Sequence, residues 1–232
     1  MVTARAKANS VASERLVEIP AGPRFVRGSL MMPPERRGIV AFAHGSGSGR
    51  LSPRNQAVAQ AMRDVGLGTL LIDLLEEEEA QDRRKVFDID LLADRLEAAA
   101  NWLHGDPDTK DLRLGYFGAS TGAGAALVAA ARQPAEIGAV VSRGGRPDLA
   151  DRSLIKVAAP TLLLVGGRDE EVIELNRQAL ALLHCPKEMV IIPGATHLFP
   201  EPGALEEVAR LAQNWFLRFL FPGSHAHHRP ER

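Results

Sequence analysis

Short apolar segments alternate with longer segments of helical period along most of this chain of 232 residues. The apolar segments are rich in β-branched residues, and most of them look buried on both sides. This alternation is typical of a mostly parallel sheet with helices on both faces. The predicted strands span residues 25–31, 39–43, 69–72, 112–117, 139–141, 161–165 and 188–192.

Two of the intervening segments predict helices most clearly. Between Ile89 and Leu103, apolar residues recur at steps of three and four, and Gly105 follows as a helix stop. Residues 205–220 repeat the pattern, and Pro222 and Gly223 end the helix. We therefore expect both helices to pack one face against the sheet.

Length and composition favour one ordinary globular domain. A chain of 232 residues is long enough for a single well-filled α/β core, and 45% hydrophobic with 25% charged residues is typical of soluble proteins. We expect one domain over residues 1–232, with about residues 1–20 and 222–232 poorly ordered. The acidic run at residues 76–79 predicts a solvated loop after a strand.

Charge and cysteine content narrow the possible partners. The formal net charge of -1 creates no field that would attract nucleic acid or an anionic membrane, so we expect small-molecule partners and a monomer or homodimer. Cys185 is the only cysteine, which excludes an intramolecular disulfide and favours the cytoplasm. No apolar run approaches the roughly 18 residues of a membrane span.

The segment at residues 118–122, Gly-Ala-Ser-Thr-Gly, is the most informative in the chain. It places G-x-S-x-G directly after a predicted strand and directly before an alanine-rich helix. Glycines on either side of Ser120 would leave room for a sharp turn that presents the hydroxyl above the sheet. The segment therefore predicts Ser120 as a nucleophile, with a phosphate-binding or plain packing turn as the alternative.

An earlier glycine-rich loop, His-Gly-Ser-Gly-Ser-Gly at residues 44–49, follows another strand. A helix is expected next, with Ser52 as its N-cap and Pro53 at its first position. An acyl-transfer enzyme needs two main-chain N–H groups directed at the developing oxyanion, and we assign these to Ser46 and Thr121. A phosphate-binding loop is the alternative, but the spacing is not G-x-G-x-x-G. We interpret His44 as structural.

Acidic residues follow the predicted strand at residues 161–165. Asp169, Glu170 and Glu171 come after a glycine turn, in the chain order that a hydrolase requires for its acid. We choose Asp169 because it comes first and because its short side chain is easier to hold rigidly against an imidazole. Glu170 remains an alternative, although both glutamates look like the first turn of a helix.

A histidine follows the last predicted strand. His197 completes the order serine, acid, histidine, whereas His104 and His184 follow no strand. The sequence therefore predicts His197 as the proton carrier. Three histidines near the end of the chain, His225, His227 and His228, are a candidate metal site, but a solvated terminus is the simpler interpretation.

With these motifs in place, the chain resembles the α/β-hydrolase superfamily, and more narrowly the dienelactone hydrolase-like group. The resemblance extends from about residue 39 to about residue 219 through HGSGSG (44–49), GASTG (118–122), GRD (167–169) and GATH (194–197). It implies the α/β-hydrolase fold, hydrolysis of an ester or lactone, and no metal or organic cofactor. Dienelactone hydrolases proper use a cysteine nucleophile, whereas this chain has Ser120, so the dienelactone substrate itself does not carry over.

The substrate side of the predicted site has two features. Residues 142–160 leave room only for a short connection where many such hydrolases insert a lid, which predicts an open, shallow site for small esters. Arg143 and Arg146, at the end of a strand, and Arg50, near the glycine loop, could pair with a substrate carboxylate, with Arg143 the first choice. Alternatively, these arginines bind neighbouring carbonyl groups.

Three functions stay open at this point. The leading one is hydrolysis of small carboxylic esters or lactones through an acyl-serine intermediate on Ser120. A thioesterase, an amidase or an acyltransferase would use the same three residues, because the motif specifies the nucleophile and not the leaving group. The third is a catalytically idle domain that only binds.

Overall fold

The computed structural model describes residues 13–221, which form an eight-stranded sheet in the order β1-β2-β4-β3-β5-β6-β7-β8. The strands β3 to β8 run parallel to one another, and β1 and β2 add an antiparallel hairpin at one edge. The predicted mostly parallel sheet is confirmed. The strands are β1 (Ser13–Ala21), β2 (Arg24–Met32), β3 (Ile39–Ala43), β4 (Gly68–Asp73), β5 (Leu114–Ala119), β6 (Ile137–Arg143), β7 (Thr161–Gly166) and β8 (Lys187–Ile192).

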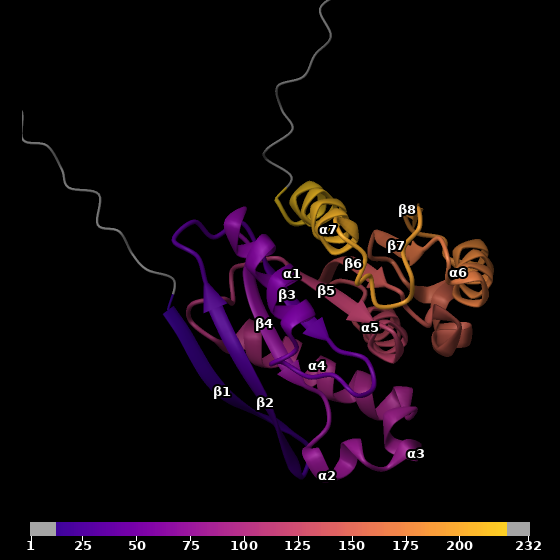
Figure 1. Ribbon diagram of the computed structural model, residues 1–232. Helices are drawn as coiled ribbons and strands as arrows, with labels where there is room; N and C mark the ends of the chain where they lie inside the picture. The colour runs from indigo at the N-terminus through magenta and orange to yellow at the C-terminus, as the bar shows by residue number, and fades with distance from the viewer. Residues whose placement is uncertain (1–12, 222–232) are drawn as a thin grey trace, which may run out of the picture.

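Helices cover both faces of this sheet (Figure 1). Helices α1 and α7 pack together on one face, and α4, α5 and α6 lie on the other. The helices are α1 (Pro53–Asp64), α2 (Glu77–Ala80), α3 (Arg83–Val86), α4 (Ile89–Gly105), α5 (Thr121–Arg132), the 3₁₀ helix η1 (Pro147–Lys156), α6 (Glu170–Leu182) and α7 (Ala204–Leu220).

The central strands are buried on both sides, as their continuous apolar sequences predict. In β3, Val40 and Phe42 pack into the core beneath α1 and α7, while Ile39 and Ala41 pack into the core that α4 and α5 cover. Successive side chains of a strand point to opposite faces, so an uninterrupted apolar run supplies two cores at once.

The boundaries predicted for the strands and the two long helices agree with the structure to within two residues. Pro53 is the first residue of α1, as predicted, but the hydroxyl of its N-cap residue Ser52 makes no capping hydrogen bond. The first-turn N–H groups of α1 therefore lack the side-chain acceptor that the sequence suggested.

The prediction that about residues 1–20 are poorly ordered is wrong for residues 13–20. They belong to β1, which pairs along its whole length with β2. Ile19 is fully buried while Leu16 is 70% exposed, so this edge strand buries only one face and lacks the strong apolar signal of the central strands. The predicted tail at 222–232, with His225, His227 and His228, lies outside the described residues.

The acidic run at residues 76–79 is exposed at residues 76–78, as predicted, but it is not a loop throughout and its last residue is not solvated. Residues 77–80 form α2, and Glu79 is buried. Its carboxylate accepts hydrogen bonds from Arg95 at 2.6 and 2.9 Å and from Lys85 at 2.9 Å. Cationic partners elsewhere in the chain, which the run itself does not reveal, turn this one glutamate inward.

The connection between β6 and β7 contains only η1, which packs against α5. A Cβ atom on Gly124 of α5 would lie 3.0 Å from the carbonyl oxygen of Arg146, so the two segments are in close contact. The connection is thus packed against α5 and forms no lid.

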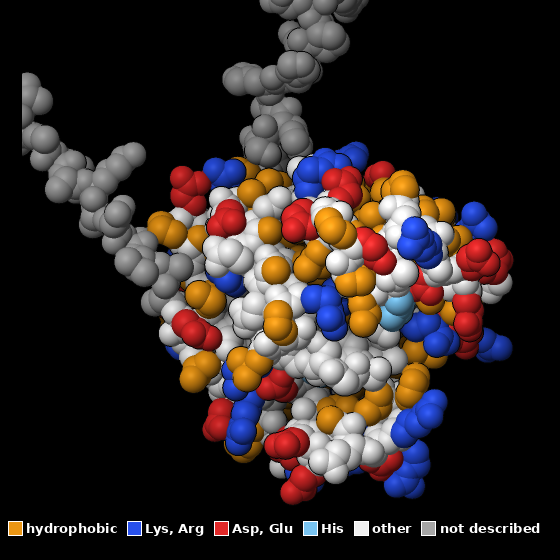
Figure 2. Space-filling model, viewed as in Figure 1, with side chains coloured by type: hydrophobic (Ala, Val, Ile, Leu, Met, Phe, Trp, Pro, Cys, Tyr) orange, Lys and Arg blue, Asp and Glu red, His pale blue; other side chains and the backbone are white. Residues whose placement is uncertain are grey.

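Figure 2 shows acidic and basic side chains interspersed over one face of the molecule. None of the described helices is both long enough and apolar enough to cross a membrane.

Candidate active site

Ser120 occupies the sharp turn between β5 and α5. Its backbone has φ 50° and ψ -124°, a conformation that a residue with a side chain rarely adopts and that costs about 1–3 kcal/mol. Surrounding hydrogen bonds hold it in place: the Ser120 carbonyl accepts from the N–H groups of Ala123 (3.1 Å) and Arg146 (3.0 Å), and the Ser120 N–H donates to the Arg143 carbonyl (3.4 Å). The turn is therefore built to present this side chain.

The glycines around Ser120 are required by close backbone approach. A Cβ atom on Gly122 would lie 2.2 Å from the carbonyl oxygen of Ala43, and one on Gly118 would lie 2.5 Å from the Cα of Ala123. A Cβ atom on Gly45 would lie 2.7 Å from the Cβ of Ser120. The two glycine-containing segments that the sequence singled out thus pack directly against each other.

Asp169 and His197 meet at the same end of the sheet. His197 Nδ1 lies 2.6 Å from Asp169 Oδ2, with 40% of the imidazole and 17% of the carboxylate side chain exposed. Glu170 and Glu171 belong to the first turn of α6 and form no hydrogen bond to this imidazole. The structure therefore brings together the acid and the histidine that the sequence selected.

Backbone hydrogen bonds join the two loops that carry these residues. The N–H of Gly167 donates to the Ile192 carbonyl at 2.8 Å, and the N–H of Arg168 donates to the Ala195 carbonyl at 2.9 Å. Glu201, after the histidine loop, accepts from the N–H of Thr196 at 3.1 Å and from its hydroxyl at 2.7 Å. These contacts restrict the position of the His197 backbone.

Ser120 and His197 line two adjoining cavities together with Ser46. One, of about 260 Å³, also contacts Arg54 and Arg143, and the other, of about 170 Å³, has the apolar side chains of residues 87, 172 and 175. In this structure the imidazole of His197 is hydrogen-bonded to Asp169, and no hydrogen bond joins it to the Ser120 hydroxyl. In enzymes without bound substrate, contacts of this kind are often long and tighten on binding.

The two residues predicted as oxyanion donors, Ser46 and Thr121, line one cavity together with Ser120. Thr121 is the first residue of α5, so its N–H has no acceptor within the helix. Ser46 is exposed at the mouth of the glycine loop and borders both cavities. The role of these two N–H groups in binding an oxyanion stays a prediction.

His44 has the structural role that we predicted. Its Nε2 accepts a hydrogen bond from the N–H of Leu74 at 3.0 Å, so its Nδ1 carries the proton and donates to the Gly45 carbonyl at 2.9 Å. Burial lowers the pKa of this imidazole, which keeps it neutral. His44 thus ties the glycine loop to the loop after β4. Nδ1 of His104 lies 3.7 Å from Oε2 of Glu136. Neither His104 nor His184 lines the two cavities.

The three candidate arginines differ in their partners in the structure. Arg50 forms an ion pair with Asp73 at 3.0 Å, and Arg146 forms one with Asp148 at 2.7 Å, so each already has a carboxylate of the protein as its partner. Arg143 is only 7% exposed and borders the cavity beside Ser120. The sequence analysis missed Arg54, the second residue of α1, although its place just after the glycine loop was a usable signal.

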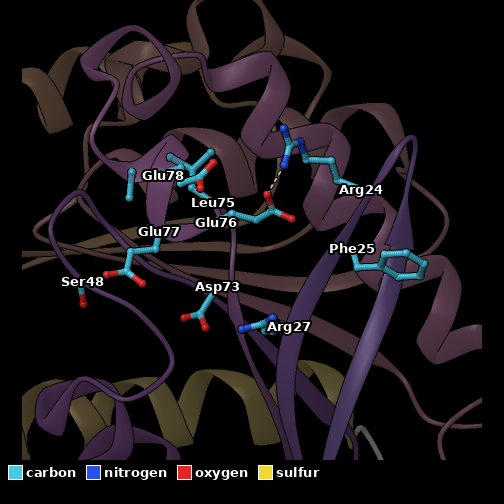
Figure 3. A pocket seen from close by; sticks show the side chains of 10 residues that line it. Arg24, Phe25, Arg27, Ser48, Asp73, Leu75, Glu76, Glu77 and Glu78 are labelled. Carbon is cyan, nitrogen blue, oxygen red and sulfur yellow. Dashed lines mark hydrogen bonds and ion pairs between the residues drawn. The ribbon is translucent and has the colours of Figure 1, made fainter.

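A larger cavity of about 670 Å³ lies beside the β1–β2 turn and does not contain Ser120 (Figure 3). Its walls carry both acidic and basic side chains, among them the ion pair of Arg24 with Glu76. Ser48 of the glycine loop borders both this cavity and the one beside Ser120. Within residues 13–221, no group of three or more His, Cys, Asp or Glu side chains is arranged to hold a metal ion.

Comparison with known proteins places these features in a family. Residues 54–220 match the model of the dienelactone hydrolase family. The crystal structure of a dienelactone hydrolase from Anabaena variabilis is 55% identical, with a TM-score of 0.88 over 90% of this chain and 99% of that one. An α/β serine hydrolase without a lid from Xanthomonas campestris, 22% identical over 89% of this chain and 95% of its own, has a TM-score of 0.73 and shows the same fold.

One curated relative carries a different kind of name. A Mycobacterium tuberculosis protein named putative phosphoribosyl transferase is 57% identical over 204 residues, which is 88% of this chain but 46% of that protein. The chain thus spans less than half the length of this relative. On the family match and the similarity to the Anabaena protein, the chain belongs to the dienelactone hydrolase family and has the α/β-hydrolase fold.

Proposed function

We propose that this protein is a serine hydrolase that cleaves small carboxylic esters or lactones through an acyl intermediate on Ser120. The observation that carries the proposal is the convergence, on one pair of cavities, of a serine at a strained turn and a histidine bound to a carboxylate. This is the set of groups that acyl transfer requires, on the fold and in the chain order typical of such enzymes.

The proposed reaction follows from the atoms involved. Asp169 accepts a hydrogen bond from the Nδ1–H group of His197, which leaves Nε2 free to remove the proton of the Ser120 hydroxyl. The serine oxygen adds to the carbonyl carbon, and the N–H groups of Ser46 and Thr121 stabilise the resulting oxyanion. When the tetrahedral intermediate collapses, the C–O bond of the leaving alcohol breaks and His197 returns the proton to that oxygen. Water, deprotonated by His197, then adds to the acyl carbon; the bond between that carbon and the Ser120 oxygen breaks, and His197 returns the proton to the serine oxygen.

The cavity sizes favour small substrates. The two spaces beside Ser120 measure about 260 and 170 Å³, and the described connection between β6 and β7 forms no cover above them. Ligand sites for drug-sized molecules usually measure about 300–1,000 Å³. The relative named putative phosphoribosyl transferase extends well beyond the matched region, so we propose no transferase activity for this chain from that name.

Covalent labelling tests the nucleophile directly. We expect a fluorophosphonate to label the wild-type protein at Ser120 and not to label Ser120→Ala, which should also lose at least about 10³-fold in ester hydrolysis. Thermal unfolding of both proteins controls for folding. A folded wild-type protein that resists the label and hydrolyses no ester or lactone would contradict the proposal and favour a binding domain.

Rates on matched acyl compounds separate the possible leaving groups. 4-Nitrophenyl acetate, an acetyl thioester and acetanilide present the same acyl group to Ser120 but release a phenol, a thiol or an amine. We expect the ester to have the highest kcat/KM relative to its uncatalysed hydrolysis. A higher relative value for the thioester or the anilide would replace the proposed substrate class with that of a thioesterase or an amidase.

A further inference from the structure

Two arginines beside Ser120 have no acidic partner. Among the ion pairs of the described residues, none includes Arg143 or Arg54, whereas Arg50 and Arg146 nearby are both paired. Arg143 is only 7% exposed, and its Nε and Nη1 atoms are buried with no hydrogen-bond partner, as is Nε of Arg54. A buried cation without a partner is costly, so this arrangement needs a compensating ligand or a functional reason.

The fold directs both side chains to one place. Arg143 ends β6 and lies in register with Ala119, directly before the nucleophile. It continues the row of Ala139 and Val141, which face α1 and α7, and Arg54 lies in the first turn of α1. Both arginines line the 260 Å³ cavity that Ser120 and His197 also border.

The electrostatics of the pair agree with this geometry. Burial lowers the pKa of Arg143 to about 10, and the nearby positive charge of Arg54 contributes to the shift. Arg143 therefore remains protonated at neutral pH, and the two positive charges repel each other while the cavity is empty. An anion placed between them would relieve the repulsion and satisfy the free N–H groups, because guanidinium groups match carboxylate and phosphate oxygens.

We infer that Arg143 and Arg54 form an anion subsite, and that the preferred substrates carry a carboxylate or a phosphate close to the scissile ester. This inference rests on the proposed hydrolase function for the reaction but not for the binding of the anion. It also replaces Arg50, which the sequence suggested, with Arg54.

Matched esters measure the charge preference. We expect kcat/KM for mono-4-nitrophenyl glutarate to exceed that for its neutral methyl ester, and Arg143→Met to lower the value for the acid by roughly 10- to 100-fold while changing the neutral ester less than about threefold. Arg54→Met should act in the same direction, and Arg143→Lys should restore part of the preference. Arg50→Met, which removes a paired arginine, should leave the ratio of acid to neutral ester unchanged. Equal rates for both esters in the wild type, or equal losses on both in Arg143→Met, would exclude an anion on the acyl side of the ester.

The same comparison locates the anion. An acidic alcohol side, in 4-carboxyphenyl acetate against 4-acetylphenyl acetate, tests the leaving group, and 4-(phosphonooxy)phenyl acetate tests phosphate in the same position. An Arg143-dependent preference in any one of these pairs supports the subsite and assigns its position and its anion. The absence of such a preference in all of them overturns it.

Binding without turnover separates this inference from the proposed function. In Ser120→Ala, glutarate or inorganic phosphate should raise the melting temperature, and the shift should disappear when Arg143→Met is added. Arg143→Met alone should melt at or above the wild-type temperature, because it removes a buried unpaired charge. Failure of fluorophosphonate labelling with a retained, Arg143-dependent shift would refute the hydrolase and keep the subsite. Normal labelling, with no shift from either anion and no preference among the esters, would refute the subsite alone.

Discussion

At the scale of residues, the absence of side chains at two glycines shapes the turn that carries Ser120. The turn at Ser120 exists because Gly118 and Gly122 lack side chains that would strike the chain on either side. The sequence identified these glycines correctly from the need for a sharp turn. The structure shows in addition what Gly122 packs against. A side chain at this position would meet the end of β3, and not only the β5–α5 turn itself. The glycine loop and the serine turn are therefore one packed unit.

Gly122→Ala tests this close contact. The added methyl group would lie 2.2 Å from the Ala43 carbonyl oxygen, so the end of β3 and the start of α5 must move apart. We expect a loss of about 1–3 kcal/mol in the free energy of unfolding, measured by urea denaturation, and at least a tenfold loss in kcat because Ser46 and Thr121 are displaced from each other. Gly105→Ala, where nothing lies within 4 Å of the new atom, is the control and should be neutral. Unchanged stability and activity in Gly122→Ala would contradict the close approach.

At the scale of elements, the connection from β4 to α4 is held by one buried carboxylate. Glu79 of α2 binds Arg95 of α4, which also donates to the Leu74 carbonyl at 2.6 Å. This network anchors the segment that carries Phe87 to the rim of the cavity beside Ser120. The run of four glutamates predicted only a charged surface, because the identity of the buried member depends on Arg95, which lies on another helix.

Glu79→Gln should therefore destabilise the protein more than the same substitution at the neighbouring glutamates does. The hydrogen bond from Arg95 is the main cause that lowers the Glu79 pKa from 4.5 to about 2. A lowered carboxylate pKa stabilises the fold above the unfolded pKa, and this contribution, on the order of 3 kcal/mol, is lost as pH falls from about 4.5 to about 2. We expect the difference in unfolding free energy between wild type and Glu79→Gln to be roughly 3–5 kcal/mol at neutral pH and to shrink across that range.

The neighbouring glutamate provides the control for this measurement. Glu78 is exposed on the same helix and forms no ion pair among the described residues, so Glu78→Gln should change the unfolding free energy by less than about 0.5 kcal/mol. A difference for Glu79→Gln that stays constant between about pH 5 and pH 2.5 would contradict the lowered pKa.

At the scale of the whole molecule, one sheet separates two apolar cores. The chain has two tryptophans, and each reports on one core: Trp215 lies in the core beneath α1 and α7, and Trp102 packs at the edge of the other with Arg15 over its ring at 5.3 Å. Every central strand contributes to both cores. The two sides should therefore unfold together.

Variants with a single tryptophan test the prediction of one domain. In Trp102→Phe, fluorescence follows the core around Trp215, and in Trp215→Phe it follows the other core. Within each variant, we expect the fluorescence and circular dichroism transitions in urea to coincide, as in two-state unfolding. Transitions that separate within either variant would mean that the two sides of the sheet unfold independently.

Local patterns were sufficient to predict the layered fold, the sharp turn at Ser120 and the pairing of Asp169 with His197, because strand period, glycine turns and chain order are all readable along the sequence. Tertiary structure alone decided which charged groups are satisfied. Arg50 pairs with Asp73, and Glu79 pairs with Arg95. Arg143 shares a cavity with Arg54 and has no acidic partner among the described residues, and each of these facts depends on segments distant in the chain. Burial and pairing are properties of position in space, so a sequence pattern that names a charged residue does not show whether its charge is already neutralised.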